Sequence, residues 1–452
     1  MGAFHAYDIR GVYGVDFGAG EVYKIGFFLP KLLGVKKVLI GRDARVSSDE
    51  IHDSLIEGIC DSGADVYDIG LSTTPQVYYA TAKHDFGASV QITASHNPRE
   101  YNGLKISKAQ AMPVGYDTGL NLLEAWIGAG NPAAERTVTP SAQRGQVIPF
   151  SVREEYLTFL RGYMGDYSRL KMGIDLSNGM AALFIKDLLG TAPHYLFDTL
   201  DGTFPNHEPN PLVPDNIKAL QELVVHEKCD IGIIFDGDAD RVMFTDELGQ
   251  FISPDLIIGV LGHYFLEDKG LRGPVLQDIR TSKAVGEYLA PMGAQMHTWR
   301  VGRAFAAPKL REINGLFGGE LAGHYYFKDF FYSDSGIMAA LIILDVVGKM
   351  KAKGLSVSQL VSRIARYHNS GEINYKIDKK EEAMEVIRDY FIAKEDPTVS
   401  YDFDGYRVEF ADWWFNIRPS NTEPYLRFIA EAASRELLRE KIKIVNRLIH
   451  SI

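Results

Sequence analysis

The stretch Ile231-Gly232-Ile233-Ile234-Phe235-Asp236-Gly237-Asp238-Ala239-Asp240-Arg241 joins an apolar run to three carboxylates at every second position. The apolar half has the length and composition of a buried parallel strand. The carboxylates therefore lie where the strand ends, the edge at which ligands bind in α/β sheets. Carboxylates about 4 Å apart repel by about 4 kcal/mol per pair at an effective dielectric of ~20, and a divalent cation removes this repulsion. The pattern predicts a metal site at Asp236, Asp238 and Asp240, and Mg²⁺ suits such hard oxygen ligands.

Two other interpretations of this stretch stay open. The three aspartates and Glu247 occupy the first, third, fifth and twelfth positions of a helix-flanked calcium loop. However, Arg241 stands at the sixth position, where that loop requires Gly, and Val242-Met243-Phe244 is typical of a strand. The second alternative is a solvated acidic turn that binds no metal.

Length, composition and charge limit the class of protein. A chain of 452 residues exceeds what one hydrophobic core usually supports, which suggests about three domains, with two or four possible. Hydrophobic residues make up 46% of the chain, enough for several cores. The net charge of −11 argues against nucleic acid or an anionic membrane surface as the main partner. Attraction for an anionic substrate must therefore be local.

The cysteine count and the apolar segments indicate the compartment. Cys60 and Cys229 are the only two cysteines, so the sequence contains neither a disulfide framework nor a Cys-based zinc cluster. Met1 to Arg10 lacks the apolar core of a signal peptide. The longest apolar stretch, Gly336 to Leu344, ends at Asp345 and is too short to span a bilayer. We therefore expect a cytoplasmic protein that does not associate with membranes.

Short β-branched runs alternate with helix-like segments, which favours an α/β fold. The clearest of these runs lie at 38–41, 89–93, 172–175 and 274–278. Turn-rich segments that indicate linkers or long loops lie near 131–150, 206–214 and 368–371. The end of the chain differs, with a strand-like Tyr406 to Phe410, a polar loop at 418–424 and a closing helix. This order predicts a small α+β domain at the C-terminus.

A second motif, Thr93-Ala94-Ser95-His96-Asn97-Pro98, follows another apolar strand. It places Ser95 at a strand-to-loop corner, because Pro98 prevents a helix from starting before it. A serine at such a corner can act as a nucleophile or can cap a nearby helix, and both interpretations stay open. A serine hydrolase is less favoured, since the Gly-x-Ser-x-Gly motif is absent.

Shortly after Ser95, the segment Tyr101-Asn102-Gly103-Leu104-Lys105-Ile106 predicts a strand that returns from the same loop and places Lys105 ten residues after the serine. Lys105 on this strand can move a proton at neutral pH if burial or a neighbouring cation lowers its pKa. Without such an environment, Lys105 is an ordinary solvated lysine.

Two polar loops follow later in the chain. Gly318-Gly319-Glu320-Leu321-Ala322-Gly323-His324 places a carboxylate and an imidazole in a glycine-rich loop that a ligand can approach closely. Glu320 can accept two sugar hydroxyls, while His324 alone is structural as often as functional. Arg418-Pro419-Ser420-Asn421-Thr422-Glu423-Pro424 offers the guanidinium, hydroxyl and amide groups that bind phosphate, although an ordinary polar turn stays open. Arg10, Arg42 and Arg45 add cations near the N-terminus that surface salt bridges explain equally well.

Ser-His-Asn-Pro, Asp-Gly-Asp-Ala-Asp-Arg, Gly-Glu-Leu-Ala-Gly-His and Arg-Pro-Ser-Asn-Thr-Glu-Pro occur in this order along the chain. Together they resemble the α-D-phosphohexomutase superfamily over essentially the whole chain, and they look closest to the bacterial phosphomannomutase/phosphoglucomutase enzymes. The resemblance implies a four-domain α/β architecture around a central cleft, with three related mixed α/β domains and a C-terminal α+β domain. The domains that carry the phosphoserine, metal, sugar-binding and phosphate-binding loops are expected at 1–149, 150–253, 254–368 and 369–452.

The resemblance also implies an isomerase reaction. The expected enzyme interconverts hexose 1-phosphate and hexose 6-phosphate, with mannose and/or glucose as the sugar, through a phosphoserine and a hexose 1,6-bisphosphate. The implied cofactors are Mg²⁺ and the hexose 1,6-bisphosphate, which is also the activator. The implied partner is a phosphorylated hexose, and the expected assembly is a monomer or homodimer.

The family's functional residues map onto positions of this sequence. Ser95 would carry the phosphoryl group and would join Asp236, Asp238 and Asp240 as a magnesium ligand. The implied catalytic residues are Ser95, Lys105, His96, Arg241 and His324. The implied substrate-binding residues are Arg10, Arg280, Arg303, Glu320, Arg418, Ser420, Asn421 and Thr422.

Two positions depart from the family pattern. Ala322 stands where many relatives have serine, and Arg303 stands where histidine is expected. Both leave the sugar specificity open. The alternatives to the expected mutase are a phosphoglucosamine mutase, a non-catalytic sugar-phosphate-binding homologue and a metal-dependent phosphohydrolase that would release free phosphate. The presence of Ser95, Lys105 and the three aspartates argues against the non-catalytic alternative.

Overall fold

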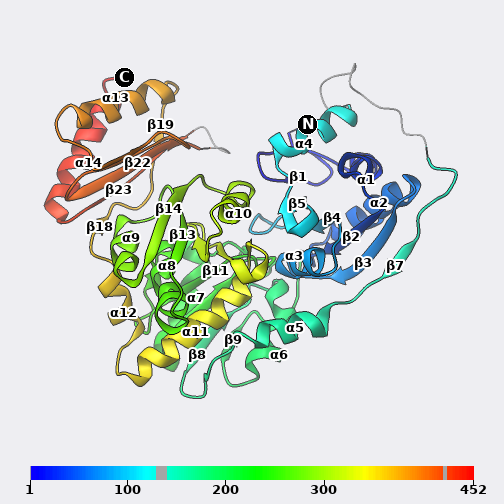
Figure 1. The fold of residues 1–452 in the computed structure, drawn as a ribbon, viewed down its shortest axis with the longest axis horizontal. Coiled ribbons are helices and arrows are strands. Elements are labelled where there is room, and N and C mark those ends of the chain that lie inside the picture. Colours follow the sequence, from blue (N-terminus) through cyan, green and yellow to red (C-terminus); the bar gives the residue numbers. More distant parts are fainter. Residues whose placement is uncertain (1, 129–139, 421–424) are drawn as a thin grey trace.

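The computed structural model describes residues 2–128, 140–420 and 425–452 and contains four β-sheets with helices packed around them (Figure 1). We name the four parts domains I to IV after their sheets, in chain order. In Figure 1 they follow an arc from domain I, in blue, to domain IV, in orange and red. Three mixed sheets and one antiparallel sheet confirm the predicted α/β class and its four parts. The domain boundaries given above stay predictions.

Domain I is built on a mixed sheet in the order β1-β5-β4-β2-β3-β7, with β6 paired to β5. The strands β2, β3, β4 and β7 are parallel, and β5 runs back antiparallel to both β4 and β1. The strands are β1 (Ile9–Val12), β2 (Lys37–Arg42), β3 (Asp65–Leu71), β4 (Ala88–Ile92), β5 (Tyr101–Lys108), β6 (Met112–Pro113) and β7 (Val147–Pro149). The helices are α1 (Ala19–Leu33), α2 (Ser48–Asp61), α3 (Thr74–Lys83), η1 (Ala109–Ala111), η2 (Tyr116–Thr118) and α4 (Leu120–Trp126).

Domain II has the sheet order β12-β11-β10-β8-β9. The prediction of a buried parallel strand at β10 is half right. The strand is buried throughout and parallel to β8, but it pairs antiparallel with β11, because the acidic loop is short enough to form a hairpin. The strands are β8 (Met172–Asp175), β9 (His194–Leu196), β10 (Ile231–Phe235), β11 (Val242–Thr245) and β12 (Phe251–Ile252). The helices are α5 (Arg153–Arg161), η3 (Met180–Leu183), α6 (Ile185–Leu189) and α7 (Pro214–Glu227).

Domain III repeats this plan with the sheet order β14-β13-β15-β16-β17. The pairs β13–β14 and β13–β15 are parallel, and the last two strands are antiparallel. The strands are β13 (Gly273–Asp278), β14 (Ala294–Trp299), β15 (Phe317–Gly319), β16 (Tyr325–Phe327) and β17 (Ser333–Asp334). The helices are α8 (Pro254–Gly262), η4 (His263–Asp268), α9 (Lys283–Leu289), η5 (Ala290–Met292), α10 (Arg303–Glu312), η6 (Lys328–Phe330), α11 (Gly336–Ala352) and α12 (Val357–Ile364).

Domain IV is the predicted small α+β unit, with an antiparallel sheet in the order β18-β23-β22-β21-β20 and β19 paired to β23. The strands are β18 (His368–Asn369), β19 (Ile373–Lys376), β20 (Val399–Tyr401), β21 (Tyr406–Glu409), β22 (Trp413–Pro419) and β23 (Tyr425–Ala432). Two helices complete it, α13 (Lys380–Ile392) and the predicted closing helix α14 (Arg435–Ile449).

The apolar run at Gly336 to Leu344 forms the first half of α11, and every residue of this run is buried. The helix packs against β11 and α5 of domain II and against α8 and α12 of domain III. Its residues belong to one hydrophobic cluster shared by both domains. Among the described residues, none of the helices is long and apolar enough to cross a membrane.

Two of the predicted linkers contain regular structure. The segment 131–150 ends in β7, which pairs parallel with β3, and part of it lies outside the described residues. The segment 368–371 begins with β18, a short strand paired with β23. In both cases the pairing strand belongs to another part of the sequence, so the local composition contained no sign of it.

The helices α1 and α2 of domain I cross at two glycines. A Cβ atom at Gly58 would lie 2.0 Å from the carbonyl oxygen of Tyr23, and one at Gly26 would lie 2.3 Å from that of Leu55. These are backbone atoms, which cannot move aside as a side-chain tip can. The close approach of the two helices therefore requires glycine at both positions.

We predict that Gly58→Ala lowers the free energy of unfolding of domain I by about 1–3 kcal/mol through overpacking. Thermal unfolding followed by circular dichroism would measure it. The control is Gly20→Ala on α1, where a Cβ meets nothing within 4 Å and alanine should be neutral or stabilise by about 0.4–1 kcal/mol. Equal melting temperatures for both variants would contradict the packing argument.

Candidate functional site

Ser95 lies in the corner between β4 and β5, as predicted, and is buried. Its φ of 52° lies in the left-handed region, which non-glycine residues adopt at a cost of about 1–3 kcal/mol, often at functional sites. The Ser95 hydroxyl donates to Asp236 Oδ2 at 2.8 Å, and His96 Nδ1 lies 3.4 Å from the Ser95 Oγ. The predicted serine corner therefore faces the predicted acidic loop of domain II.

The Ser95 loop is held in shape by Arg45. Its Nη1 donates to the carbonyls of Pro98 at 2.7 Å and Tyr101 at 3.0 Å, and its Nη2 donates to those of Ser95 at 2.8 Å and Asn97 at 2.7 Å. The side chain is buried. The alternative of a surface salt bridge is wrong for Arg45, because one guanidinium satisfies four carbonyls that the tight loop leaves without strand partners.

The three aspartates of the acidic loop are all buried. Asp236 accepts the Ser95 hydroxyl and also Arg241 Nε at 2.9 Å on Oδ2, and the Arg241 amide at 3.2 Å on Oδ1. Both oxygens of Asp236 are thus occupied by donors. Burial, followed by the charges of Asp238 and Asp240, raises the pKa of Asp236 to about 7. The two neighbouring carboxylates thus add to the cost of ionising the buried Asp236.

Lys105 pairs with the other two aspartates. Its Nζ donates to Asp238 Oδ2 at 2.6 Å and to Asp240 Oδ2. Burial alone would lower the pKa of Lys105, but the two carboxylates raise it well above its ordinary value. In this arrangement Lys105 is a partly buried ammonium paired with two carboxylates, and neither a solvated lysine nor a base.

The second oxygens of Asp238 and Asp240 have no donor. Asp238 Oδ1 and Asp240 Oδ1 are both buried and accept no hydrogen bond from any described residue. A buried carboxylate oxygen without a partner costs about 1–3 kcal/mol or more. The ligand atoms of the three aspartates lie within 4.8 Å of one another. Two bare carboxylate oxygens beside the Ser95 hydroxyl fit a hard divalent cation such as Mg²⁺.

The calcium-loop alternative is wrong for this chain. Glu247, its twelfth position, accepts the amide of Ser358 at 3.0 Å and the hydroxyl of Ser358 at 2.5 Å, so it is occupied elsewhere. The chain forms β11 before Glu247 and β12 soon after it, whereas a helix directly follows the calcium loop. The acidic turn is also not solvated, since its three carboxylates are buried.

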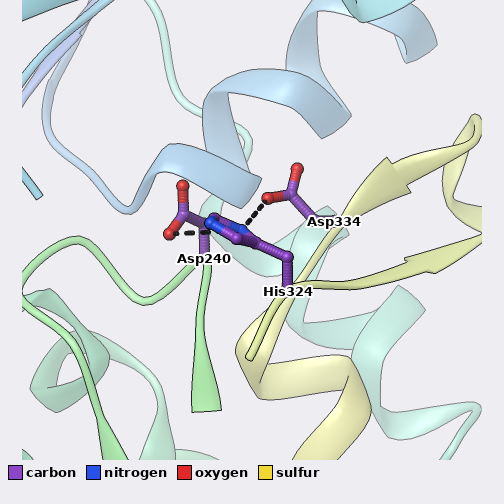
Figure 2. A group of neighbouring side chains, drawn as sticks. All are labelled: Asp240, His324 and Asp334. Atoms are coloured by element: carbon purple, nitrogen blue, oxygen red, sulfur yellow. Dashed lines mark hydrogen bonds and ion pairs between the residues drawn. The ribbon is translucent and has the colours of Figure 1, made fainter. Parts of the chain in front are cut away.

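His324 joins the acidic loop from domain III. Arg241 and His324 form an antiparallel bridge between their backbones. The imidazole lies between two carboxylates, with Nδ1 2.6 Å from Asp334 Oδ2 and 3.9 Å from Asp240 Oδ1 (Figure 2). Burial alone would lower the pKa of His324, but Asp240 and Asp334 raise it above its ordinary value. The pair favours a protonated imidazole.

Arg10 and Arg303 also face this group. Arg10 donates to Asn97 of the Ser95 loop at 2.8 Å and to Asp8 at 2.5 Å. Arg303 Nε donates to Asp334 Oδ1 at 3.1 Å, and its Nη2 donates to the Ala111 carbonyl of domain I at 2.7 Å. The Arg303 guanidinium also lies 3.7 Å from the centre of the Tyr78 ring. Arg303 thus ties domain III to domain I beside His324.

A second group of polar side chains surrounds Glu320. Glu320 is buried, and its Oε1 accepts the Tyr326 hydroxyl at 2.9 Å and the Gly302 amide at 3.2 Å. Arg280 pairs with Asp278 at 2.6 Å and lies close enough to Glu320 for their charges to interact. The predicted sugar-loop carboxylate therefore has a cation nearby.

Arg418 comes to the same region from domain IV. It lies in β22, which corrects the prediction that 418–424 is a loop throughout, because β22 and β23 form a hairpin whose pairing extends to Pro419. Arg418 is buried and pairs weakly with Asp404 at 3.4 Å. Directly across the hairpin stands Arg427, and the charges of Arg280 and Arg427 lower the Arg418 pKa after burial itself. Like charges opposed in a sheet repel, and the Glu372 carboxylate, 3.2 Å from Arg427 Nη1, offsets part of this repulsion.

The remaining residues of the predicted phosphate loop are partly described. The Ser420 amide donates to the Tyr425 carbonyl at 2.9 Å, which closes the hairpin. Asn421 and Thr422 lie outside the described residues. Sequence reasoning missed Asp334, Thr74 and Arg427. For Arg427 a signal existed, since counting back across the 420–424 turn pairs it with Arg418, whereas Asp334 and Thr74 carry no local motif.

Comparison with known proteins gives full-length matches. Family models described as "Phosphoglucomutase/phosphomannomutase" match as alpha/beta/alpha domain I at residues 1–127, domain II at 154–249, domain III at 253–367 and C-terminal domain at 372–445. A phosphomannomutase of Salmonella montevideo is 34% identical, with 99% of each chain covered. Phosphohexose mutases of Xanthomonas campestris are 35% identical over 97% of this chain and 96% of theirs.

Solved structures agree. A phosphoglucomutase/phosphomannomutase family protein from Burkholderia thailandensis superposes with a TM-score of 0.87 at 27% identity, covering 99% of this chain and 97% of that one. The full-length correspondence means that the arrangement of the four domains, and not of one domain alone, is shared.

The bare carboxylate oxygens predict that Mg²⁺ stabilises the folded protein. A ligand present at a hundredfold excess over its Kd stabilises by about 2.7 kcal/mol. We expect a higher melting temperature in excess Mg²⁺ than in EDTA for the wild type. The Asp238→Asn/Asp240→Asn double variant should lose this difference, because it lacks both ionised oxygens.

Glu247→Gln is the matched control, since it removes a nearby carboxylate that the calcium loop would need and the magnesium site does not. Each variant is compared with its own sample in EDTA by scanning fluorimetry. A Mg²⁺ effect that survives in the double variant, or is lost in Glu247→Gln, would contradict the site.

Proposed function

Because the chain belongs to the phosphoglucomutase/phosphomannomutase family, and is therefore a mutase of the isomerase class, we propose that it interconverts hexose 1-phosphate and hexose 6-phosphate. The sugar is mannose and/or glucose. The reaction passes through a phosphoserine at Ser95 and a hexose 1,6-bisphosphate. The relatives named phosphomannomutase support mannose as the first sugar to test.

One observation carries this proposal: the buried Ser95 hydroxyl, held on a strained backbone, lies 2.8 Å from Asp236 in a loop with two bare carboxylate oxygens. A serine beside three carboxylates is poorly placed to act as a bare nucleophile on a dianionic phosphate, because the charges repel. It is well placed to carry a phosphoryl group if a dication lies between them.

Asp236, Asp238, Asp240 and the Ser95 phosphoryl group would hold the Mg²⁺ ion. When bound, the ion would neutralise the carboxylates and withdraw charge from the phosphoryl oxygens. The protein's own cations do the rest of the electrostatic work. Arg241 is locked against Asp236, and Arg10 donates to the Ser95 loop, so both lie where negative charge develops.

In the proposed transfer, the Ser95 Oγ–P bond breaks as the free hydroxyl oxygen of the hexose phosphate bonds to the same phosphorus. The hydroxyl proton goes to a protein base, and the serine oxygen takes up a proton and becomes a hydroxyl. The bisphosphate then returns its other phosphoryl group to Ser95 by the reverse steps. One phosphoryl group enters and one leaves, so the net change is isomerisation.

Lys105 and His324 are the proposed proton carriers, and the described arrangement limits when each can act. The pKa of Lys105 is raised by Asp238 and Asp240, so it can accept a proton only after those charges are neutralised. His324 is held by Asp334, which favours its role as a donor. The pKa of His96 is lowered well below its ordinary value by burial and by Arg241, so we assign it hydrogen bonding near Ser95 as a neutral ring.

The second phosphate of the substrate is proposed to bind at Arg418, Arg280 and Arg427, together with Ser420, Asn421 and Thr422. The position of Arg418 supports this assignment, since its buried Nε has no hydrogen-bond partner among the described residues and a phosphate oxygen would supply one. Glu320 lies between this group and His324, where it can accept sugar hydroxyls. These local cations provide the attraction that a chain of net charge −11 lacks as a whole.

Two residues bear on the sugar specificity. Ala322 gives the sugar loop a methyl group at the position where the family pattern has a serine hydroxyl. Arg303 has its Nε and Nη2 bonded to Asp334 and Ala111, so we propose that it acts on the substrate through the position of Asp334 and His324. Mannose, glucose and glucosamine phosphates are therefore tested side by side.

We expect Mg²⁺-dependent conversion of mannose 1-phosphate to mannose 6-phosphate after priming with a hexose 1,6-bisphosphate. Ser95→Ala should lower kcat by roughly 10³-fold or more, since the covalent step is lost. Ser107→Ala is the control, because Ser107 is an equally buried serine on β5 of the same domain.

Coupled assays for each 6-phosphate product measure turnover, and intact-protein mass measures phosphorylation. Full activity of Ser95→Ala would overturn the phosphoserine, and release of free phosphate at the rate of turnover would indicate a phosphohydrolase instead. Turnover of glucosamine 1-phosphate alone would move the assignment to a phosphoglucosamine mutase.

A further inference from the structure

Thr74 is the first residue of α3 in domain I, and it lies against the acidic loop of domain II. It is fully buried. The preceding residue, Thr73, caps the helix by accepting the Gln76 amide at 3.1 Å. Because Thr73 performs the capping, the Thr74 hydroxyl is not needed to start the helix, and it points to another partner.

That partner is Asp238, which Thr74 contacts twice. The Thr74 hydroxyl donates to Asp238 Oδ2, and the Thr74 amide donates to the Asp238 carbonyl at 3.1 Å. The amide bond fixes the backbone of the acidic loop against α3, while the hydroxyl bond fixes the carboxylate. The positive end of the α3 dipole also favours the ionised carboxylate at this place.

The two oxygens of Asp238 are consequently unequal. Oδ2 accepts both the Thr74 hydroxyl and Lys105 Nζ, whereas Oδ1 accepts no donor from the described part of the chain. A carboxylate held by Lys105 alone can rotate about its last bond, because the flexible ammonium of a lysine follows either oxygen. The hydroxyl of a buried, β-branched threonine has a restricted rotamer and does not follow.

We propose that Thr74 is a positioning residue for the metal site: its hydroxyl orients Asp238 so that Oδ1 stays bare and directed at the cation. This inference rests on the proposed Mg²⁺ site at Asp236, Asp238 and Asp240. It also means that domain I contributes to the metal affinity of a loop in domain II. Groups that orient metal ligands typically change affinity by about 10–100-fold when removed.

The test measures Mn²⁺ binding, with Mn²⁺ as a spectroscopic substitute for Mg²⁺. The free ion is followed by electron paramagnetic resonance on full-length protein whose phosphorylation has been matched by intact mass. Thr74→Val keeps the shape and the backbone amide bond but removes the hydroxyl, and should weaken Mn²⁺ binding about 10-fold or more. Thr74→Ser restores the hydroxyl and should bind close to the wild type.

Thr81→Val is the matched control on the same helix. Thr81 is also fully buried, and its hydroxyl donates to the Val77 carbonyl at 2.5 Å and can accept from the Ser89 hydroxyl at 2.7 Å, so the variant loses a hydroxyl of the same kind that does not contact Asp238. We expect unchanged Mn²⁺ affinity for Thr81→Val.

The outcomes separate this inference from the proposed function. If the wild type binds no Mn²⁺, the metal site itself fails and the role of Thr74 fails with it. If the wild type binds and Thr74→Val binds equally well, only the inference is overturned. It is also overturned if Thr74→Ser is as weak as Thr74→Val, or if Thr81→Val weakens binding to the same degree, because the cause would then be general damage to α3.

Discussion

The burial of three carboxylates within five residues is the constraint on which the rest of this site depends. Charges at this spacing repel by several kcal/mol per pair, and buried carboxylates need paired cations and donors. The chain meets that need from several domains, with Lys105 and Thr74 from domain I and Arg241 from domain II itself. The Oδ1 atoms of Asp238 and Asp240 still have no donor in the described part of the chain. This shortage of positive charge is the reason why we propose a further cation at this place.

The site consists of two groups of side chains with opposite charge, one acidic and one basic. The acidic loop and Ser95 form one, where phosphoryl transfer is proposed. Arg280, Arg418 and Arg427 form the other, and they pair with Asp278, Asp404 and Glu372 respectively. Glu320 and His324 lie between them, four residues apart on one glycine-rich loop. In the proposed reaction, the non-reacting phosphate of the hexose binds at the arginines while the other end of the sugar exchanges a phosphoryl group with Ser95.

Sequence reasoning predicted the parts of the site that local pattern encodes. The strand before Asp236, the corner at Ser95 and the strand that carries Lys105 each follow from apolar runs and their ends. It placed Arg418 in a loop, because hairpin pairing with residues beyond the turn decides that strand's end. It could not find Thr74, Asp334 or the role of Arg45, since each acts through partners from distant parts of the sequence. The raised pKa of Lys105 also depends on residues more than a hundred positions away.

Those long separations affect how the site is made during protein synthesis. Ser95 and Asp236 are 141 positions apart, and Lys105 and Asp240 are 135 apart. A ribosome that adds about 5–20 residues per second needs about 7–28 s to cover that interval. We expect the serine loop to form before domain II is synthesised, because the four carbonyl partners of Arg45 all belong to domain I. Both carboxylate partners of Lys105 belong to domain II, so we expect the site to assemble only after domain II has been synthesised.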